Sequence, residues 1–460
     1  MKIEKRWIFA FSLIAVVAVL GLFWDQLGFH GITTSVFLGE EAINYSDVAW
    51  VLTSACLVLL MTPGLSFFYG GMVGKKNVIS TMLQSFICLG VVSLLWVVVG
   101  FSMAFGDPIL YVDATEMIDG VEQSVRYSFL GNPLSFAFLE NVGTLPHSAM
   151  ASSIPFLLFA IFQMKFAIIT PAIITGSFAE RVRFISYLVF ISLFSLIIYT
   201  PLCHMIWHPN GFLGLGGYFK IADFAGGTVV HMSAGFAALA GALFLGKRKN
   251  FSHEPTNIPF VILGTGMLWF GWFGFNAGSA LGASGDAAKA FITTNSASAA
   301  AMLTWIFFDR INGRKVSAMG ASIGAVVGLV AITPAAGFVT VPQSIFFGFI
   351  TAIVSNVLVN WSAMNNKLDD TLDVFACHGV GGIMGMILTA IFAEGEGIVS
   401  WKTQGFGAFS SHMLALVLVS VFTLVGAFLL YKVTDMIIPL RVTEEAEEMG
   451  LDLSQHDENI

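Results

Sequence analysis

Long apolar runs recur along this chain of 460 residues, and they constrain its fold more than any other feature. Hydrophobic residues make up 56% of the sequence and charged residues only 11%, whereas about a quarter of a soluble domain is charged. The mean hydropathy is +0.83. The runs have the length of membrane-spanning helices and lack the alternating pattern of an outer-membrane barrel. The sequence therefore predicts an all-α polytopic membrane protein.

The first apolar run, Trp7–Trp24, is separate from the others and follows a short basic segment. It fits either a signal peptide or a retained anchor helix, and its length and the lack of a clear cleavage site favour the anchor. We expect an N-terminal anchor and outer segment over residues 1–47, a transport domain over 48–432 and a cytoplasmic regulatory tail over 433–460. Eleven core spans are predicted, at Val48–Tyr69, Val78–Phe105, Met150–Thr175, Phe184–Trp207, Asp223–Leu245, Ile258–Gly278, Ala290–Phe308, Ser317–Pro334, Pro342–Ala363, Leu372–Ala393 and Ala408–Lys432.

Basic residues are distributed unevenly between the two sets of loops that these spans connect. If the first core span runs from outside to inside, sixteen Lys and Arg residues fall inside, including Lys2 and Lys367. Only Arg126, Lys220, Lys289 and Lys402 fall outside, and Lys165 lies within a span. Because basic loops remain in the cytoplasm, we expect a multi-pass protein of the cell (inner or plasma) membrane with a cytoplasmic C-terminus.

Two histidines, His231 and His378, lie deep in the fifth and tenth core spans, each eight positions after an aspartate, Asp223 or Asp370. Eight residues of helix rise about 12 Å, less than half of a hydrocarbon core of roughly 30 Å. Both rings are therefore expected near the middle of the membrane. Since five spans separate them, their helices run in opposite directions. This pattern predicts an eleven-helix core with a five-plus-five inverted repeat, plus the extra N-terminal helix.

A histidine inside a membrane is either a buried ring bonded to a neighbouring helix or a group that touches a transported species or a proton. Its repetition in two matching positions favours the second interpretation. Three functions fit the pair: a transporter or channel for a small cation or weak base, an electron carrier with a haem between the imidazoles, and a receptor that signals through the tail. A haem needs a far wider cavity, and few residues follow Lys432 for an output domain. The transporter is therefore favoured.

Aromatic residues gather where several spans end on the outer side. Trp207 ends the fourth span, Phe162 and Phe166 lie four apart on one side of the third, and the aromatic run 269–279 ends the sixth. Such residues are typical of an interfacial aromatic belt. They also suit a ring of π faces that holds a small cation without an acidic residue. The residues alone leave both interpretations open.

Four sequence motifs carry a resemblance to a known family. They are FFYGG at 67–71, DFAGGTVVH at 223–231, GWFGFNAGS at 271–279, and DVF at 373–375 followed by His378-Gly379. In this order and spacing they resemble the ammonium transporter family (Amt/Mep/Rh), and its Amt branch in particular. The resemblance covers about residues 48–460.

The resemblance implies ammonium uptake by a homotrimer with one pore in each subunit. An ammonium sensor of the same fold with little transport is the alternative. A PII-type signalling protein is implied as a partner of the tail. The residues that match family positions are the twin pore histidines His231 and His378, the gate Phe166 and Phe275, the recruitment site Phe162, Trp207 and Ser279, and the aspartate beneath it, Asp223.

Desolvation suggests the mechanism. A bare ammonium ion in a dry pore would lose many kcal/mol of hydration, so we expect it to give up its proton while neutral ammonia crosses. Adjacent imidazoles can relay that proton, because one ring nitrogen donates while its partner accepts. We expect electrogenic uptake, with ammonium or ammonia and the lipid bilayer as partners. The pattern is not that of an enzyme and indicates no cofactor, metal or nucleic acid.

Several features depart from the family pattern or lie outside it. The N-terminal span is extra, and the outer loop 107–146 is long and polar, so it is expected to form a small cap. Lys165, beside the gate residue Phe166, is expected either to point away from the pore or to be neutral within it. The tail after Arg441 has seven acidic residues and no basic one. It is expected to be solvated, or to dock on a basic partner or on the inner loops at Lys247–Lys249 and Arg310–Lys315.

Overall fold

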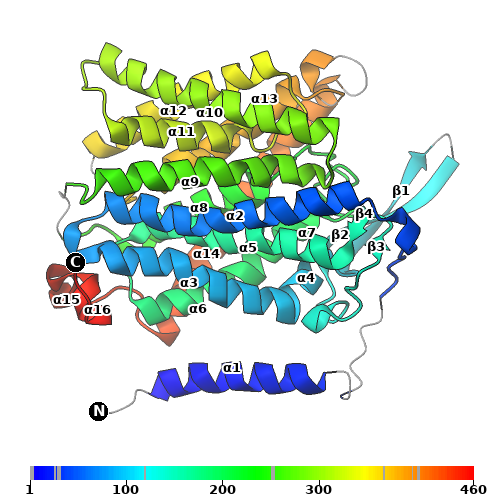
Figure 1. The fold of residues 1–460 in the computed structure, drawn as a ribbon, viewed down its shortest axis with the longest axis horizontal. Helices are drawn as coiled ribbons and strands as arrows, with labels where there is room; N and C mark the ends of the chain where they lie inside the picture. The colour runs from blue at the N-terminus through cyan, green and yellow to red at the C-terminus, as the bar shows by residue number, and fades with distance from the viewer. Residues whose placement is uncertain are drawn as a thin grey trace.

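The computed structural model describes residues 5–24, 27, 33–118, 121–249, 254–365, 368–395, 397–400 and 405–460. Lys2, Lys367 and Lys402 of the charge argument lie outside these ranges. Within them the chain forms a bundle of long helices that run side by side (Figure 1). The predicted all-helical membrane fold is thereby confirmed.

The eleven predicted core spans all correspond to helices, some with a π-helical turn inside the span. Ten of them are long and apolar enough to cross a membrane, and the eleventh, α11, is shorter. The helices are α2 (Tyr45–Met72), α3 (Val78–Leu95) with η4 (Trp96–Gly100) and α4 (Phe101–Phe105), α5 (Phe156–Phe178), α6 (Phe184–Phe194) with η6 (Ser195–Tyr199) and α7 (Thr200–Trp207), η7 (Gly227–Met232) with α8 (Ser233–Leu245), α9 (Ile258–Ala277), α10 (Gly285–Ile311), α11 (Ala318–Ile332), α12 (Val341–Asn365), η9 (Phe375–Gly379) with α13 (Val380–Phe392), and α14 (Gly405–Ile437).

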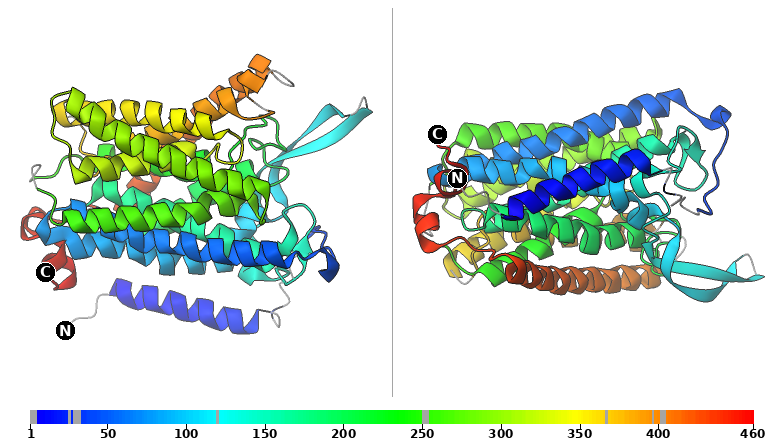
Figure 2. Two further views of the ribbon diagram at one scale, coloured as in Figure 1. Left: turned by 45° about the horizontal axis from the view of Figure 1, so that its top comes forward. Right: turned by 90° about the horizontal axis from the view of Figure 1, so that it is seen from below.

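The extra N-terminal helix is present as α1 (Lys5–Phe23), which lies along the outside of the bundle (Figure 2). None of its residues is buried. Trp24, just beyond its end, contacts the ring of Phe138 at a centroid distance of 4.7 Å and donates a hydrogen bond to Glu140. The helix is therefore attached to the core near its ends and only lightly along its length.

The two ends of the bundle are structurally distinct. At one end, here named the hairpin end, strands β1 (Pro108–Ile118) and β2 (Val121–Gly131) form an antiparallel hairpin that projects from the body (Figure 1). At the other, the tail end, lie the short helices α15 (Glu444–Met449) and α16 (Leu451–His456), and α1 begins there (Figure 2). The long polar loop is thus a projecting hairpin and not a compact cap.

One predicted boundary is wrong by about two turns. Helix α5 begins at Phe156 and not at Met150, because Ala151–Pro155 forms the extended strand β4. This strand pairs with Pro146–His147, strand β3. Pro155 then serves as the N-cap of α5 with extended backbone angles. An apolar run therefore continues across an extended segment that hydropathy alone does not separate from the helix.

The spans that carry the two histidines cross in opposite directions, as the repeat requires. Gly235, after the first histidine, packs against the backbone of Gly379 near the start of the second span. A side-chain carbon on Gly227, at the start of the first span, would lie 3.1 Å from the sulfur of Met386, late in the second. The contact partner thus moves back toward the start of the second span as the first span proceeds, and the predicted opposite orientation is confirmed.

The tail is packed and not solvated. Asp452 accepts hydrogen bonds from the backbone of Ile79 and Ser80 at the start of α3, at 3.1 and 2.7 Å. Glu447 accepts from the backbone of Lys249 at 2.7 Å and pairs with Arg441. The expected docking on Lys247–Lys249 is therefore present. A wholly solvated tail is the wrong expectation, because Glu444, Glu447 and Asp452 find basic and N–H partners, although other acidic residues of the tail are exposed.

Candidate functional site

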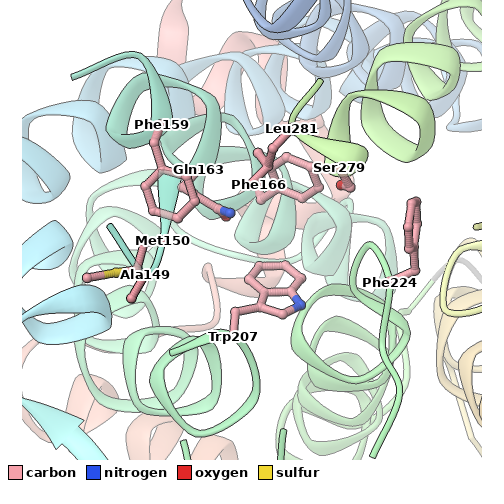
Figure 3. Close-up of a pocket in the computed structure, with 9 residues that line it drawn as sticks. All are labelled: Ala149, Met150, Phe159, Gln163, Phe166, Trp207, Phe224, Ser279 and Leu281. Carbon is pink, nitrogen blue, oxygen red and sulfur yellow. The ribbon is translucent and has the colours of Figure 1, made fainter. Parts of the chain in front are cut away.

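A pocket opens among helix ends at the hairpin end of the bundle. Its volume is about 160 Å³, and Phe166, Trp207 and Ser279 line it, as the sequence suggested (Figure 3). The rest of its wall is Ala149, Met150, Phe159, Gln163, Phe224 and Leu281. None of these nine residues is acidic, so a cation here would meet π faces and neutral oxygen atoms. We name this the outer pocket.

Two predicted recruitment residues do not line the outer pocket. Phe162 is fully buried with its ring 5.0 Å from that of Phe166, so it supports the wall from behind. The carboxylate of Asp223 accepts hydrogen bonds from the backbone N–H groups of Gly226, Gly227 and Thr228, at 2.7–2.8 Å, and from the Thr228 hydroxyl. Its own carbonyl accepts the indole N–H of Trp207 at 3.1 Å. Asp223 therefore positions Trp207 and the start of η7.

Two phenylalanine rings lie at the floor of the outer pocket. The rings of Phe166 and Phe275 are 4.3 Å apart between centroids and inclined by 40°. Trp207 meets Phe166 edge to face at 5.8 Å. Both phenylalanines are buried. A species leaving the outer pocket in this direction must displace these rings, so the geometry suits a gate.

The two histidines meet directly below the phenylalanine pair. Their Nδ1 atoms are 3.3 Å apart, and each ring is buried. A direct hydrogen bond between two imidazole nitrogens requires one to donate and the other to accept. His231 Nε2 has no hydrogen-bond partner among the described residues. One nitrogen of the pair is therefore available to a passing molecule.

The histidines line a narrow apolar cavity, here named the passage. Its volume is about 10 Å³, close to the minimum that one water-sized molecule needs. Aliphatic and aromatic side chains supply the rest of its wall, among them Ile169, Leu268 and Trp272. The passage admits a small neutral molecule and, apart from the imidazole nitrogens, offers no polar group to solvate an ion.

Both histidines lie on π-helical turns, η7 and η9. Such turns are rare and are common at functional sites. Each is preceded by a residue in the left-handed region, Gly226 at φ 118° and Asp373 at φ 56°, three positions after the capping aspartate. Asp370 accepts the backbone N–H of Phe375 at 2.7 Å, as Asp223 does in its own turn. The repeat therefore extends to the local turn that presents each ring.

Asp370 and Asp373 lie at the tail end of the second histidine span, in the connection before η9. Burial raises the pKa of Asp370 above its usual range despite the N–H groups that it accepts. Burial and the neighbouring charge of Asp370 likewise raise the pKa of Asp373. The proton affinity of these two buried carboxylates is therefore higher than that of exposed carboxylates.

The aromatic run at the end of α9 divides between lipid and passage. Trp272 stacks on His231 at 5.3 Å and 19°, and its N–H donates to Thr333 at 2.9 Å. Phe270, in contrast, is exposed on the surface of the bundle. Members of the run therefore face both the passage and the outside of the bundle, and the choice between belt and π ring stays a prediction.

Lys165 lies outside the walls of the outer pocket and the passage. Its Nζ is 3.9 Å from the sulfur of Met164, and the residue is half-buried. The structure therefore supports the first of the two alternatives, a side chain that points away from the pore.

Gln163 and Trp272 are the site residues that sequence reasoning missed. Figure 3 shows the Gln163 amide directed into the outer pocket, and its oxygen has no hydrogen-bond partner among the described residues. A polar side chain in an otherwise apolar span, three residues before Phe166, was the available signal. Trp272 gave no such signal, because nothing in its spacing marks it as stacked on a histidine.

The fold and the site define a multi-pass membrane protein with an aromatic pocket above a narrow apolar passage. Comparison with known proteins adds the family. Residues 49–460 match the Ammonium Transporter Family. An ammonium transporter of Aquifex aeolicus is 40% identical over 443 residues, which is 94% of this chain and 98% of the relative. The corresponding Bacillus subtilis protein is 41% identical over 90% of this chain and 98% of its own.

Solved structures agree with this assignment. Mep2 of Saccharomyces cerevisiae superposes with a TM-score of 0.77 at 30% identity, covering 88% of each chain. A protein described as a sensor Amt protein gives a TM-score of 0.78 at 29% identity, covering 90% of this chain and 98% of its own. The chain belongs to the ammonium transporter family, whose members are transporters and not enzymes.

Proposed function

We propose that this protein carries ammonium across the cell membrane, binding the ion in the outer pocket and conducting ammonia past His231 and His378. Family membership supports ammonium as the substrate. The observation that carries the mechanism is the 3.3 Å contact between the two imidazoles inside an apolar passage.

Recruitment follows from the chemistry of the outer pocket. Ser279 donates its hydroxyl hydrogen to the carbonyl of Phe275 at 2.8 Å, so its lone pairs can accept from an ammonium N–H. The Gln163 amide presents its nitrogen to the pocket (Figure 3), so its unpartnered oxygen would accept a second N–H only after the amide turns over. The faces of Trp207 and Phe166 attract the cation by about 0.5–2 kcal/mol each. No acidic residue is needed, and release into the passage is not opposed by an ion pair.

Deprotonation follows from the narrowness of the passage. The ion NH4⁺ separates into NH3 and a proton, because no group there replaces its hydration. When His231 Nδ1 carries the hydrogen of the imidazole pair, its Nε2 can take that proton. His231 Nδ1 then passes its own hydrogen to His378 Nδ1, and His378 releases the proton from its Nε2 toward the tail end, so one proton crosses with each ammonia and both rings are neutral again. Ammonia crosses as a neutral molecule, and net uptake is electrogenic.

Orientation rests on charge. The described basic residues Lys75, Lys76, Arg310 and Arg314 belong to the connections on the tail side, whereas Arg126 and Lys220 lie with the hairpin. By the positive-inside rule the tail end faces the cytoplasm and the outer pocket faces outward. The chain is then a multi-pass protein of the inner or plasma membrane with a cytoplasmic C-terminus.

The assembly and its regulation belong to the same proposal. Three copies form a homotrimer with a passage in each, and residues 48–432 form the transport domain. Residues 433–460 form a regulatory tail at which a PII-type protein docks. The contacts of Asp452 with the start of α3 and of Glu447 with the connection at Lys249 support a tail that senses the position of these two parts.

The test is the current evoked by ammonium in proteoliposomes that contain the purified protein. We expect an inward charge movement with ammonium and none with sodium or potassium at the same concentration. A specific ammonium response without measurable current or ammonia flux would contradict transport. That outcome would favour the second candidate, an ammonium sensor. The similarity to a solved structure described as a sensor Amt protein supports this alternative.

A further inference from the structure

One part of the outer-pocket wall is a turn that lies outside the membrane-spanning helices. Ala149 and Met150 form it, between strands β3 and β4, and Figure 3 shows them across the pocket from Phe224. We name these two residues the rim turn. Strand β4 then leads directly into α5, which carries Gln163 and Phe166. The position of the rim turn therefore affects the pocket on which ammonium binding depends.

His147 holds the rim turn through one ring nitrogen. Its Nδ1 accepts the backbone N–H groups of Ala149 and Met150, both at 3.2 Å. A backbone N–H can only donate, so this Nδ1 carries no hydrogen. The ring is therefore neutral, with its single hydrogen on Nε2.

The surroundings of His147 fix which nitrogen faces the rim turn. The ring packs on Phe156 at a centroid distance of 4.7 Å and meets Phe37 edge to face at 5.6 Å. Backbone hydrogen bonds of 2.9 and 3.0 Å join the segment around Phe37 to the residues on either side of His147. Its Nε2 is buried and has no hydrogen-bond partner in the part of the chain that the structure describes. The ring therefore cannot swing away without opening this junction.

A second proton on His147 would enter at Nδ1 and turn the acceptor into a donor. Both hydrogen bonds to the rim turn would be lost, and a positive ring would lie behind the wall of a cation site. Burial lowers the pKa of His147 from its ordinary value, and the charge of Asp107 opposes part of this shift. The carboxylate of Asp107 is itself held by the backbone N–H of Thr34 at 3.0 Å. Protonation of His147 therefore falls on the acidic side of the ordinary histidine range.

Two further histidines lie near this junction, and both are committed elsewhere. The rings of His204 and His208 stack at 4.3 Å and 17°. His204 uses both nitrogens, Nδ1 on the carbonyl of Ala104 at 2.9 Å and Nε2 on the hydroxyl of Ser128 at 2.8 Å. Burial, together with the charges of His204 and His147, lowers the pKa of His208 to about 3. His208 therefore stays neutral at the mildly acidic pH at which His147 responds.

We propose that His147 is a positioning residue of the outer pocket, whose neutral ring holds the rim turn in place for ammonium binding. When the outside becomes acidic the ring takes a proton, the rim turn loosens and the affinity for ammonium falls. This inference rests on the proposed recruitment of ammonium in the outer pocket. It adds a proton-sensitive group at the entrance that is separate from the histidine pair in the passage.

The variant His147→Asn separates the two properties of the ring. At the start of α2 the side-chain oxygen of Asn44 accepts the N–H groups two and three residues later, at 3.0 and 3.4 Å. An asparagine at position 147 can hold the rim turn in the same way but does not titrate. His147→Ala removes the acceptor altogether. His456→Asn is the matched control, the same substitution in the tail.

Ammonium currents of the full-length protein in proteoliposomes, at outer pH 7 and 5, are the first measurement. We expect the half-saturating ammonium concentration of the wild type and of His456→Asn to rise by roughly three- to tenfold at pH 5. His147→Asn should match the wild type at pH 7 and keep that value at pH 5. His147→Ala should show the raised value at both. An equal rise in the wild type and in His147→Asn would overturn the proposal.

Hydrogen exchange of the backbone over residues 148–152 is the second measurement, and it needs no transport. The wild type should lose protection at pH 5 relative to His147→Asn at the same pH, and the two should agree at pH 7. Equal protection at both values would overturn the role of His147. The expected exchange without any ammonium current in the wild type would contradict the proposed function, yet support the role of His147 in holding the rim turn.

Discussion

At the residue scale, the proposed site separates groups that would touch ammonium from groups that hold them in place. Trp207 presents its ring, Ser279 its hydroxyl and Gln163 its amide to the outer pocket (Figure 3). Asp223 lies outside the pocket wall and holds other residues in place. Its carbonyl accepts the Trp207 indole N–H, and its carboxylate caps the start of η7. An acidic residue next to a cation site is easily taken for a ligand, yet this carboxylate is already saturated with N–H and O–H donors.

Trp207→Leu should weaken the apparent ammonium affinity by a cation–π increment of about 1 kcal/mol, roughly fivefold. The maximal current should change less, because the histidines remain in place. Concentration-dependent currents in proteoliposomes separate the two parameters. An unchanged half-saturating concentration would show that the indole is not part of the binding pocket.

Lys165→Ser should keep ammonium transport or raise it, because the side-chain amine of Lys165 lies outside the outer pocket and the passage. The expected result is a current at least equal to that of the wild type in a protein with the same assembly size. Loss of transport in a correctly assembled variant would place Lys165 in the path and contradict this description of the gate.

At the element scale, close helix contact brings the histidines together. Gly235 leaves no room for a side chain, because a carbon there would overlap the backbone of Gly379. The sequence places small residues after each histidine, and such residues allow helices to approach closely. It could not show the π-helical turns, because they arise from tertiary fit and from the aspartate caps and not from local propensity.

Gly235→Ala should separate η9 from α8, cost about 1–3 kcal/mol of stability and reduce the ammonium current. Gly266→Ala is the matched control, because a side-chain carbon there meets open space. Thermal unfolding in detergent and proteoliposome currents measure both. If Gly235→Ala behaves like Gly266→Ala, the glycine contact does not set the histidine distance.

A buried ionic cluster ties three connections together at the tail end. Asp369 accepts from Arg248 at 2.9 Å and from Arg181 at 3.3 Å, and Arg248 also pairs with Glu180 at 2.8 Å. Burial alone would raise the pKa of Asp369, but the hydrogen bonds from Arg248 and the charges of both arginines outweigh it, so the pKa is lowered.

Asp369→Asn should lower the free energy of unfolding by about 3–5 kcal/mol at neutral pH, because two buried guanidinium groups lose their carboxylate. A carboxylate with a lowered folded pKa stabilises above its unfolded pKa and loses that effect as pH falls. The gap in melting temperature between wild type and variant should therefore be constant above about pH 4 and shrink below it. A gap that widens on acidification would contradict the assigned charge state.

At the scale of the whole molecule, hydropathy and charge predicted the helix count, the N-terminal helix and the opposite directions of the repeat. Hydropathy and charge failed where the backbone changes between strand and helix without a clear change in hydropathy. Ala151–Pro155 is apolar like the helix that follows, and β1 and β2 alternate too weakly to be distinguished from a loop. Phe162 was predicted to line the outer pocket, but Gln163 lines it instead. A shift of one helix position decides which of two neighbouring residues faces a cavity. Charge suggested the contact of the acidic tail with Lys247–Lys249, but not the contact of Asp452 with the start of α3, because its N–H partners carry no charge and lie far away in the sequence.

The measurement that tests the central claim most directly is ammonium current and ammonia flux in the same proteoliposomes, for the wild type and for His231→Ala and His378→Ala. Each variant should lose proton-linked current or show flux without charge, while its assembly size is unchanged. His456→Ala, the same substitution in the tail, should behave as the wild type. Full, ammonium-selective current in both passage variants would contradict a proton relay through the histidine pair.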